Sequence, residues 1–236
     1  MTTYILVHGS LHGAWCWDKV VPLLKQAGHQ VVANDLPGMG SDNTPLTDVS
    51  LQSWTDALCD LIDQAPEPVV LVGHSRGGLN ISQAAEQRPD KIKMLVYLCA
   101  FLLRNGETVA GFALSPDSQF ANNIVVADDG VSATLNEESV LELFFADCSD
   151  EDADRASSLL SPEPLAPLST PVSITDANYG RVPRVYIETL EDKAVLPSLQ
   201  KQMYEALPCE RVISMSTSHS PFLSAPEELV GHLLAV

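Results

Sequence analysis

The sequence predicts an α/β fold in which a mostly parallel sheet of about six strands is flanked by helices. Short apolar runs rich in β-branched residues alternate with segments of helical spacing. At residues 69–78 the sequence VVLVGHSRGG changes without a spacer from an apolar run to a glycine-rich turn. The 236 residues are 45% apolar, enough for the large core of one domain.

Six apolar runs are expected to form the strands of the sheet. Each is short and rich in residues that favour strands. Such continuous apolar runs are typical of parallel strands that are buried on both faces. They are Tyr4–Val7, Val31–Ala33, Val69–Val72, Met94–Leu98, Val185–Ile187 and Arg211–Met215.

Helically spaced apolar residues between these runs predict the covering helices. Gly28 follows the first helix and suits its C-terminus, because glycine readily adopts the left-handed conformation found there. Ser50 is placed to cap the second helix and Pro89 to end the third. The apolar positions are Trp17, Val20, Val21 and Leu24, then Leu51, Trp54, Leu58 and Leu61, then Leu79–Ala85.

The alternation stops over residues 101–183, where the sequence becomes polar, acidic and dotted with prolines. We therefore expect a core formed by residues 1–100 and 184–236, with residues 101–183 inserted as a helical lid. An amphipathic helix is predicted at Glu137–Phe145, and the acidic cluster Asp147–Asp154 is expected to be a solvated surface.

Charge and cysteine content exclude several classes of function. The 13 Lys and Arg against 31 Asp and Glu give a formal charge of −18, which would repel nucleic-acid phosphates and anionic membranes. No run approaches the roughly 18 apolar residues that span a bilayer, and the N-terminus lacks the parts of a secretory signal. Five scattered cysteines without a C-x-x-C pair favour a reduced, cytoplasmic protein.

Ser75 occupies the centre of a G-x-S-x-G pattern, Gly73–Gly77, between a predicted strand and a predicted helix. This is the pattern of a nucleophile elbow, whose sharp turn exposes a serine and requires small neighbours because a Cβ would collide there. The side chain of His74 is expected to point beneath the turn and to be structural. A serine hydroxyl is a weak nucleophile at neutral pH, so the chain must also supply a base and an acid that orients it.

His219 is predicted to be the base. An elbow of this kind is expected to be followed by the acid and then by the histidine, and only His219 and His232 lie late enough in the chain. His219 stands in a polar loop just after the last predicted strand. A surface pair with Glu228, four residues earlier in a short amphipathic helix, explains His232.

Asp192 is predicted to be the acid. The strand near residue 187 runs into the loop Thr189–Lys193, from which a carboxylate could reach the imidazole. Glu191 in the same loop is the alternative. Asp176 is a weaker candidate, because no strand precedes it.

A developing oxyanion is best stabilised by backbone N–H groups that are already aimed at it. One donor is expected at Arg76, directly after the nucleophile. The other is expected at Ser10, in the loop His8–Gly13 after the first strand. His8 and His12 have no third ligand beside them, so we predict structural hydrogen bonds for them and neither a metal nor a cofactor.

Four segments of the sequence resemble one branch of the α/β-hydrolase superfamily. That branch holds plant methyl-salicylate esterases, polyneuridine aldehyde esterase and hydroxynitrile lyases, with bacterial carboxylesterase relatives. The resemblance covers nearly the whole core and is weak in the insertion. It implies the α/β-hydrolase fold, a triad of Ser75, Asp192 and His219, and an oxyanion hole at Ser10 and Arg76. The segments are VHGSLHGAWCWDKVVPLLKQAGHQVVANDLPGMG, GHSRGG, ETLEDKAV and SHSPFLSAPEELV.

Two positions separate the chemistries of this branch. The lyases carry threonine where this chain has Gly9, and a lysine after the catalytic histidine where it has Ser220. An uncharged hydroxyl cannot replace the cation that stabilises departing cyanide. The resemblance therefore implies a serine carboxylesterase that hydrolyses small carboxylic esters through an acyl-enzyme. The alternatives are a hydroxynitrile lyase-type carbon–carbon lyase and a non-catalytic receptor for a small ligand.

The substrate pocket is expected to lie between the first loop and the insertion. Its predicted lining residues are Gly9, Leu11, Phe101, Leu102 and Phe144. The partner expected is a small-molecule ester, with no nucleic acid and no membrane. Proteins of this branch are often dimers, so the resemblance also permits a homodimer.

Overall fold

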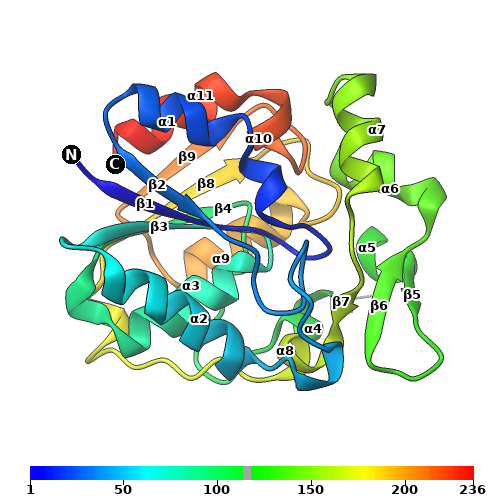
Figure 1. The fold of residues 1–236 in the computed structure, drawn as a ribbon, viewed down its shortest axis with the longest axis horizontal. Coiled ribbons are helices and arrows are strands. Elements are labelled where there is room, and N and C mark those ends of the chain that lie inside the picture. The colour runs from blue at the N-terminus through cyan, green and yellow to red at the C-terminus, as the bar shows by residue number, and fades with distance from the viewer. Residues whose placement is uncertain (114–117) are drawn as a thin grey trace.

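A six-stranded sheet with helices on both faces forms the centre of the computed structural model, which describes residues 1–113 and 118–236 (Figure 1). All six strands are parallel, in the order β2-β1-β3-β4-β8-β9, which confirms the predicted fold class. Each predicted run lies within one strand. The strands are β1 Thr3–Val7, β2 Gln30–Ala33, β3 Val69–His74, β4 Ile92–Leu98, β8 Arg184–Thr189 and β9 Arg211–Met215.

The two faces of the sheet enter two hydrophobic cores. Leu71 of β3 packs into the core beneath α2, α3 and α9, whereas its neighbours Val70 and Val72 face the core beneath α1 and α11. Burial on both faces explains why the strands are continuous apolar runs. The covering helices are α1 Val20–Gln26, α2 Leu51–Gln64, α3 Gly77–Gln87, α9 Pro197–Ala206 and α11 Pro226–Leu234.

The predicted helix boundaries are largely observed. Ser50 caps α2 in a reciprocal capping box, in which the backbone N–H of Ser53 donates to Ser50 Oγ at 3.0 Å. Gly28 follows α1 with a φ of +89°. Trp17 differs from the prediction, because it lies in a separate 3₁₀ turn, Ala14–Trp17, before α1 begins. The turn buries the indole completely, and it packs against Phe222.

Most of the described part of region 101–183 lies beside the carboxyl edge of the sheet and is not purely helical, whereas residues 173–183 return along α3 to the start of β8 (Figure 1). It contains a three-stranded antiparallel sheet, β5-β6-β7, whose strands are too short for their alternation to be read from the sequence. The predicted amphipathic helix is observed as α6. The elements are α4 Val109–Ala113, α5 Gln119–Asn122, β5 Ile124–Val126, β6 Ser132–Leu135, α6 Glu137–Phe144, α7 Asp150–Ser158, β7 Glu163–Pro164 and α8 Leu165–Ser169.

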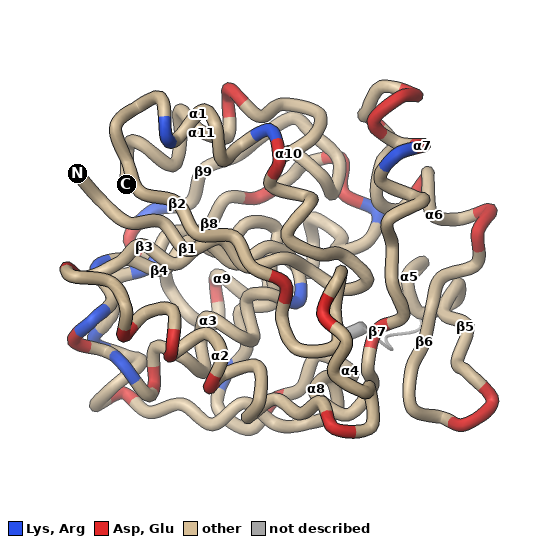
Figure 2. Tube along the Cα trace, in the orientation of Figure 1, with Lys and Arg blue, Asp and Glu red and all other residues tan. Residues whose placement is uncertain are grey.

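The acidic cluster is more than a solvated surface. Acidic residues occupy the first turn of α7, where their negative charge interacts favourably with the positive end of the helix dipole (Figure 2). Asp152 also pairs with Lys19 at 2.7 Å, and Arg155 pairs with Asp18 at 2.6 Å. These contacts connect α7 to the core. Within the described residues, no helix has both the length and the apolar character that a membrane span needs.

The closest approach of the elbow to the sheet gives a test of the fold. An added Cβ at Gly77 would lie 2.8 Å from Val7 O and 3.0 Å from His8 O, whereas one at Gly231 would meet nothing within 4 Å. We expect Gly77→Ala to lower the free energy of unfolding by about 2 kcal/mol, and Gly231→Ala, inside α11, to raise it by about 0.5–1 kcal/mol. Urea denaturation would measure both. Equal effects would contradict the close approach.

Candidate active site

Ser75 lies in the turn between the end of β3 and the start of α3. Its φ is +52°, in the left-handed region that residues with side chains rarely adopt. The turn is held against β4, since Ser75 N–H donates to Leu98 O at 3.1 Å and Phe101 N–H donates to Ser75 O at 3.0 Å. Strain of this kind persists only where surrounding contacts enforce it, and it is concentrated at functional sites.

Glycines make this turn possible. A Cβ at Gly73 would lie 2.7 Å from Gly77 O, across the turn. A Cβ at Gly9 would lie 2.9 Å from Ser75 Cβ and 2.7 Å from His74 Nδ1. The first loop of the chain can therefore approach the serine closely only because residue 9 has no side chain.

His219 and Asp192 meet inside the protein. His219 Nδ1 lies 2.7 Å from Asp192 Oδ2, and the two residues are 1% and 2% exposed. The other carboxylate oxygen accepts the backbone N–H groups of Ala194 and Val195, each at 2.8 Å, while Oδ2 also accepts the Thr189 hydroxyl at 2.9 Å. The carboxylate is thus fully satisfied and fixed. The contact favours the tautomer in which Nδ1–H is donated to Asp192 and Nε2 carries the lone pair that a general base uses.

The rival acids and the rival histidine lie elsewhere. Glu191 and Asp176 are both exposed to solvent. His232 lies 3.7 Å from Glu228 at the surface of α11. The geometry therefore brings Asp192 to His219 and leaves the alternatives outside the site.

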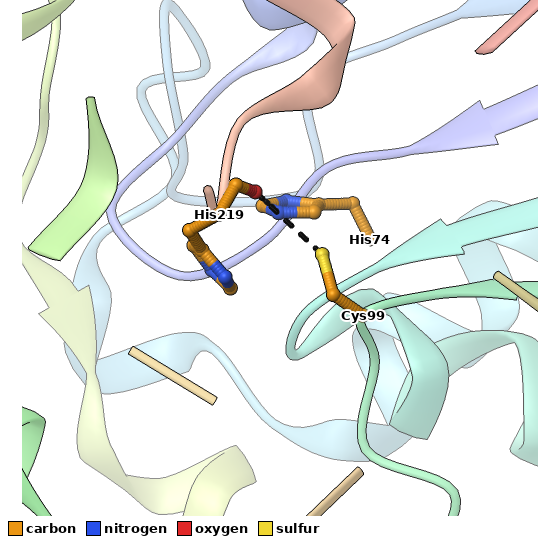
Figure 3. A group of neighbouring side chains, drawn as sticks. All are labelled: His74, Cys99 and His219. Carbon is orange, nitrogen blue, oxygen red and sulfur yellow. Dashed lines mark hydrogen bonds between the residues drawn. The ribbon is translucent and has the colours of Figure 1, made fainter. Parts of the chain in front are cut away.

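The backbone of His219 is tied to the elbow. His74 Nε2 lies 2.9 Å from His219 O, and the Cys99 thiol lies 3.6 Å from the same oxygen (Figure 3). Burial, together with the nearby His219 and His12, lowers the pKa of His74 well below its usual value, so its ring is neutral and donates through Nε2–H. Among the described residues, Ser75 Oγ makes no hydrogen bond. The hydrogen bond between a catalytic serine and its histidine base often tightens only when substrate is bound.

His74, Cys99 and His219 also place one potential ligand atom each within 4.8 Å of one another. Their chemistry does not suit a metal. His74 Nε2 and the Cys99 thiol both contact His219 O, and His219 Nδ1 is paired with Asp192 Oδ2. Burial and the nearby Asp192 also raise the pKa of the Cys99 thiol well above its usual value. The contacts to His219 O account for the cluster.

The side chain of Arg76 has a packing role that was not predicted, since the sequence indicated a role only for its backbone N–H. The fully buried guanidinium lies 4.2 Å above the Trp54 ring. It donates to Asn80 Oδ1 and to Gly9 O, each at 2.9 Å. Its Nε lies 2.8 Å from Glu163 Oε1, an ion pair in which the N–H does not point along the line between the two atoms. Burial raises the pKa of Glu163, and the adjacent arginine opposes this rise.

Glu163 was not predicted from the sequence. It lies in the two-residue strand β7, far from the elbow in sequence, and a lone glutamate in an acidic chain carries no signal. A buried arginine needs a counter-charge, but which of 31 acidic residues supplies it depends on tertiary structure.

A cavity of about 230 Å³ opens beside Ser75. Ser10, Phe101 and Phe144 are among its lining residues, and no charged side chain among the described residues lines it. The apolar wall consists of Phe101, Val109, Ala110, Phe120, Ile124, Val126, Phe144, Leu165, Leu168, Ala194, Val195 and Leu199.

Three predicted pocket residues lie outside this lining. Gly9 has no side chain and packs against His74 and Ser75. Leu11 is 3% exposed and Leu102 is 1% exposed, because each enters a hydrophobic core. Apolar character alone could not distinguish a core residue from a pocket residue.

Residues 4–232 match the sequence profile of the alpha/beta hydrolase family. The chain belongs to that family. It is 34% identical to methylesterase 1 of Arabidopsis thaliana, over 99% of this chain and 95% of that protein. It is 33% identical to the pyrethroid hydrolase of Sphingobium wenxiniae, over 97% of this chain and 85% of that protein. It spans 63% of the length of one chloroplastic Arabidopsis relative that is 37% identical.

Crystal structures of relatives share the fold throughout. A pyrethroid hydrolase from Sphingobium faniae superposes with a TM-score of 0.90 at 32% identity, covering 99% of this chain and 96% of that one. Polyneuridine aldehyde esterase gives a TM-score of 0.90 at 29% identity, covering 100% of this chain and 98% of that one. These relatives place this alpha/beta hydrolase among the carboxylic ester hydrolases and confirm the predicted resemblance.

Buried neutral histidines make the stability of this alpha/beta hydrolase depend on pH. His12 is fully buried and donates Nδ1–H to Ser10 O at 2.7 Å, and burial lowers its pKa to about 3. An unfolded chain holds histidine near pKa 6.5, so between about pH 6.5 and 3 the unfolded state binds more protons. The free energy of unfolding therefore falls as pH falls through this window.

We expect His12→Gln to flatten that dependence by up to about 1.4 kcal/mol per pH unit. The substitution removes the titrating ring but retains an amide that can donate to Ser10 O. Urea denaturation at several pH values would measure the slope, with the surface variant His232→Gln as the control. An unchanged slope in His12→Gln would show that His12 does not resist protonation in the folded state.

Proposed function

We propose that this alpha/beta hydrolase is a serine carboxylesterase with Ser75 as nucleophile, His219 as general base and Asp192 as the residue that orients the base. The buried hydrogen bond between His219 Nδ1 and Asp192 Oδ2 carries the proposal. It fixes the tautomer that leaves Nε2 free to take a proton. The backbone O of His219 is bonded to His74, the residue directly before the strained Ser75, which lines a cavity.

In the proposed reaction Ser75 Oγ attacks the ester carbonyl carbon while its proton moves to His219 Nε2. The buried carboxylate of Asp192 stabilises the resulting imidazolium. Backbone N–H groups of Ser10 and Arg76 stabilise the tetrahedral oxyanion. Collapse of this intermediate expels the alcohol, which takes the proton from His219. Water then hydrolyses the acyl group on Ser75 with His219 again acting as base.

The cavity supports uncharged esters with apolar substituents as substrates. Its walls are apolar, and its polar atoms belong to serines, so a charged substituent would lose its hydration without gaining a partner. The names of the relatives, methylesterase and pyrethroid hydrolase, agree with this substrate class. We also propose that residues 101–183 act as a lid, because most of the lining residues belong to them.

The remaining expectations follow from the same residues. Ser220 is fully buried and uncharged where a cyanohydrin lyase would hold a lysine, so the esterase is preferred to the lyase. The charge of −18 supports a protein without nucleic-acid or anionic-membrane partners, and the five free cysteines support a cytoplasmic one. Release of cyanide from mandelonitrile at rates comparable with ester hydrolysis would favour the lyase. Saturable binding of a ligand without product would favour a receptor.

Removing the nucleophile or the acid tests the assignment of the triad. We expect Ser75→Ala to lower kcat for a short p-nitrophenyl ester by about 10⁴–10⁶-fold, and Asp192→Asn by about 10⁴-fold, because an amide stabilises the wrong tautomer. The neighbouring variant Glu191→Gln serves as control and is expected to leave kcat nearly unchanged. A large loss in Glu191→Gln with little loss in Asp192→Asn would transfer the role to Glu191.

Two matched esters test the apolar cavity. p-Nitrophenyl butyrate and p-nitrophenyl hemisuccinate present the same leaving group and an acyl chain of similar length, but the second carries a terminal carboxylate. We expect kcat/KM for the hemisuccinate to be about 10²-fold lower, the cost of desolvating a charge without a partner. Comparable values would contradict an uncharged acyl-binding wall.

A further inference from the structure

Glu163 of β7 reaches from the inserted region into the carboxyl edge of the sheet. It is 3% exposed, and its ion pair with Arg76 joins two side chains that are 0% and 4% exposed. Burying an ion pair costs hydration that a surface pair retains. The mechanism proposed above does not use this carboxylate, so its position calls for a separate explanation.

The two residues on either side of Ser10 are both held by this pair. Leu11 N–H donates to Glu163 Oε2 at 2.8 Å, and Gly9 O accepts Arg76 Nη2 at 2.9 Å. Leu11 has a φ of +63°, a conformation that does not persist without such contacts. The backbone around Ser10 is thus held on one side by the carboxylate and on the other by the guanidinium.

The same pair reaches the second proposed oxyanion donor. The guanidinium belongs to Arg76, whose own backbone N–H follows the nucleophile, and it is fixed by Asn80 Oδ1 and by the Trp54 ring. Ser10 and Arg76 follow different strands and lie 66 residues apart in the sequence. Within residues 1–113 and 118–236, the Arg76 and Glu163 side chains are the ones that connect these two backbones through charge-assisted contacts.

We propose that Arg76 and Glu163 form a positioning pair for the oxyanion hole, holding the backbone N–H groups of Ser10 and Arg76 at a fixed separation. The inference rests on the proposed esterase function. Neither side chain touches the substrate. Pre-aimed donors need no reorganisation as charge develops, so loosening them lowers the stabilisation of the transition state more than the binding of the ester.

A simple anchor for the inserted region would behave differently. Lys19 and Asp152 also join that region to the core, at 2.7 Å, but their side chains are 41% and 22% exposed. Their other hydrogen-bond partners in the described part of the chain are Leu223 and Ser149, outside the first loop. If Glu163 only anchored the insertion, the loss of either ion pair would have similar consequences for catalysis. Asp152→Asn is therefore the matched control for Glu163→Gln.

The experiment compares wild type, Glu163→Gln and Asp152→Asn on p-nitrophenyl butyrate. We expect Glu163→Gln to lower kcat by about 10–10²-fold, with KM changed by less than about threefold. Asp152→Asn should retain wild-type kcat. Hydrolysis by wild type that is absent in Ser75→Ala establishes the underlying esterase, so its failure is separate from failure of the positioning role.

A matched pair of inhibitors separates positioning from general loosening. An aryl trifluoromethyl ketone accepts Ser75 Oγ at its carbonyl carbon, giving a hemiketal whose oxyanion occupies the hole while the serine proton moves to His219. The corresponding methyl ketone binds without that step. We expect Glu163→Gln to weaken the first by about the same factor as kcat/KM and to leave the second within about threefold. Equal weakening of both, or unchanged kcat, would overturn the proposal.

Glu163→Asp covers the case in which Glu163→Gln does not fold. It keeps the charge but is one methylene shorter, so it cannot bond Leu11 N and pair with Arg76 Nε in the same geometry. Circular dichroism and thermal unfolding would establish that the variant is folded. An intermediate loss in kcat, with the same inhibitor pattern, is expected. A folded Glu163→Asp with wild-type kcat would refute the positioning role.

Discussion

The tight turn at Ser75 is the constraint on which the other features of the site depend. A φ of +52° directs the serine out of the carboxyl edge of the sheet, and the backbone there tolerates only glycine at Gly73, Gly77 and Gly9. Because β3 lies between β1 and β4, the turn touches both neighbouring strand ends. The loop that carries Ser10 and the segment that begins at Phe101 are therefore already beside the serine when the sheet forms.

The inserted region takes part in the site as well as covering it. Asp147 accepts the backbone N–H of Ser218 at 2.9 Å and also its hydroxyl, directly before His219. Phe144 stacks on the His219 ring with centroids 5.5 Å apart. Glu163 holds the first loop. The position of each loop thus depends on packing between the core and the insertion, which couples the stability of the insertion to the geometry of the site.

What the sequence could predict follows the range of the interactions involved. Strands and the elbow are local patterns. The contact between Asp192 and His219 could be predicted because loops at the carboxyl edge of a parallel sheet converge. Glu163 was not, since its partner Arg76 is distant in sequence and the strand β7 has two residues. Trp17 was misplaced within its helix because a 3₁₀ turn and an α-helix share similar apolar spacing over one turn.

Two buried histidines of the first loop, His8 and His12, are held neutral beside the site. His8 donates Nδ1–H to Gly9 O and accepts the Leu36 N–H at Nε2, so a proton on Nε2 would face the Leu36 N–H. Burial, together with the nearby Arg76, lowers the pKa of His8 to about 3. His12 is kept neutral by burial, which lowers its pKa to about 3, and its Nδ1–H donates to Ser10 O. Burial thus keeps both rings neutral beside the proposed base, so the apolar packing around the site decides which of its groups carry charge.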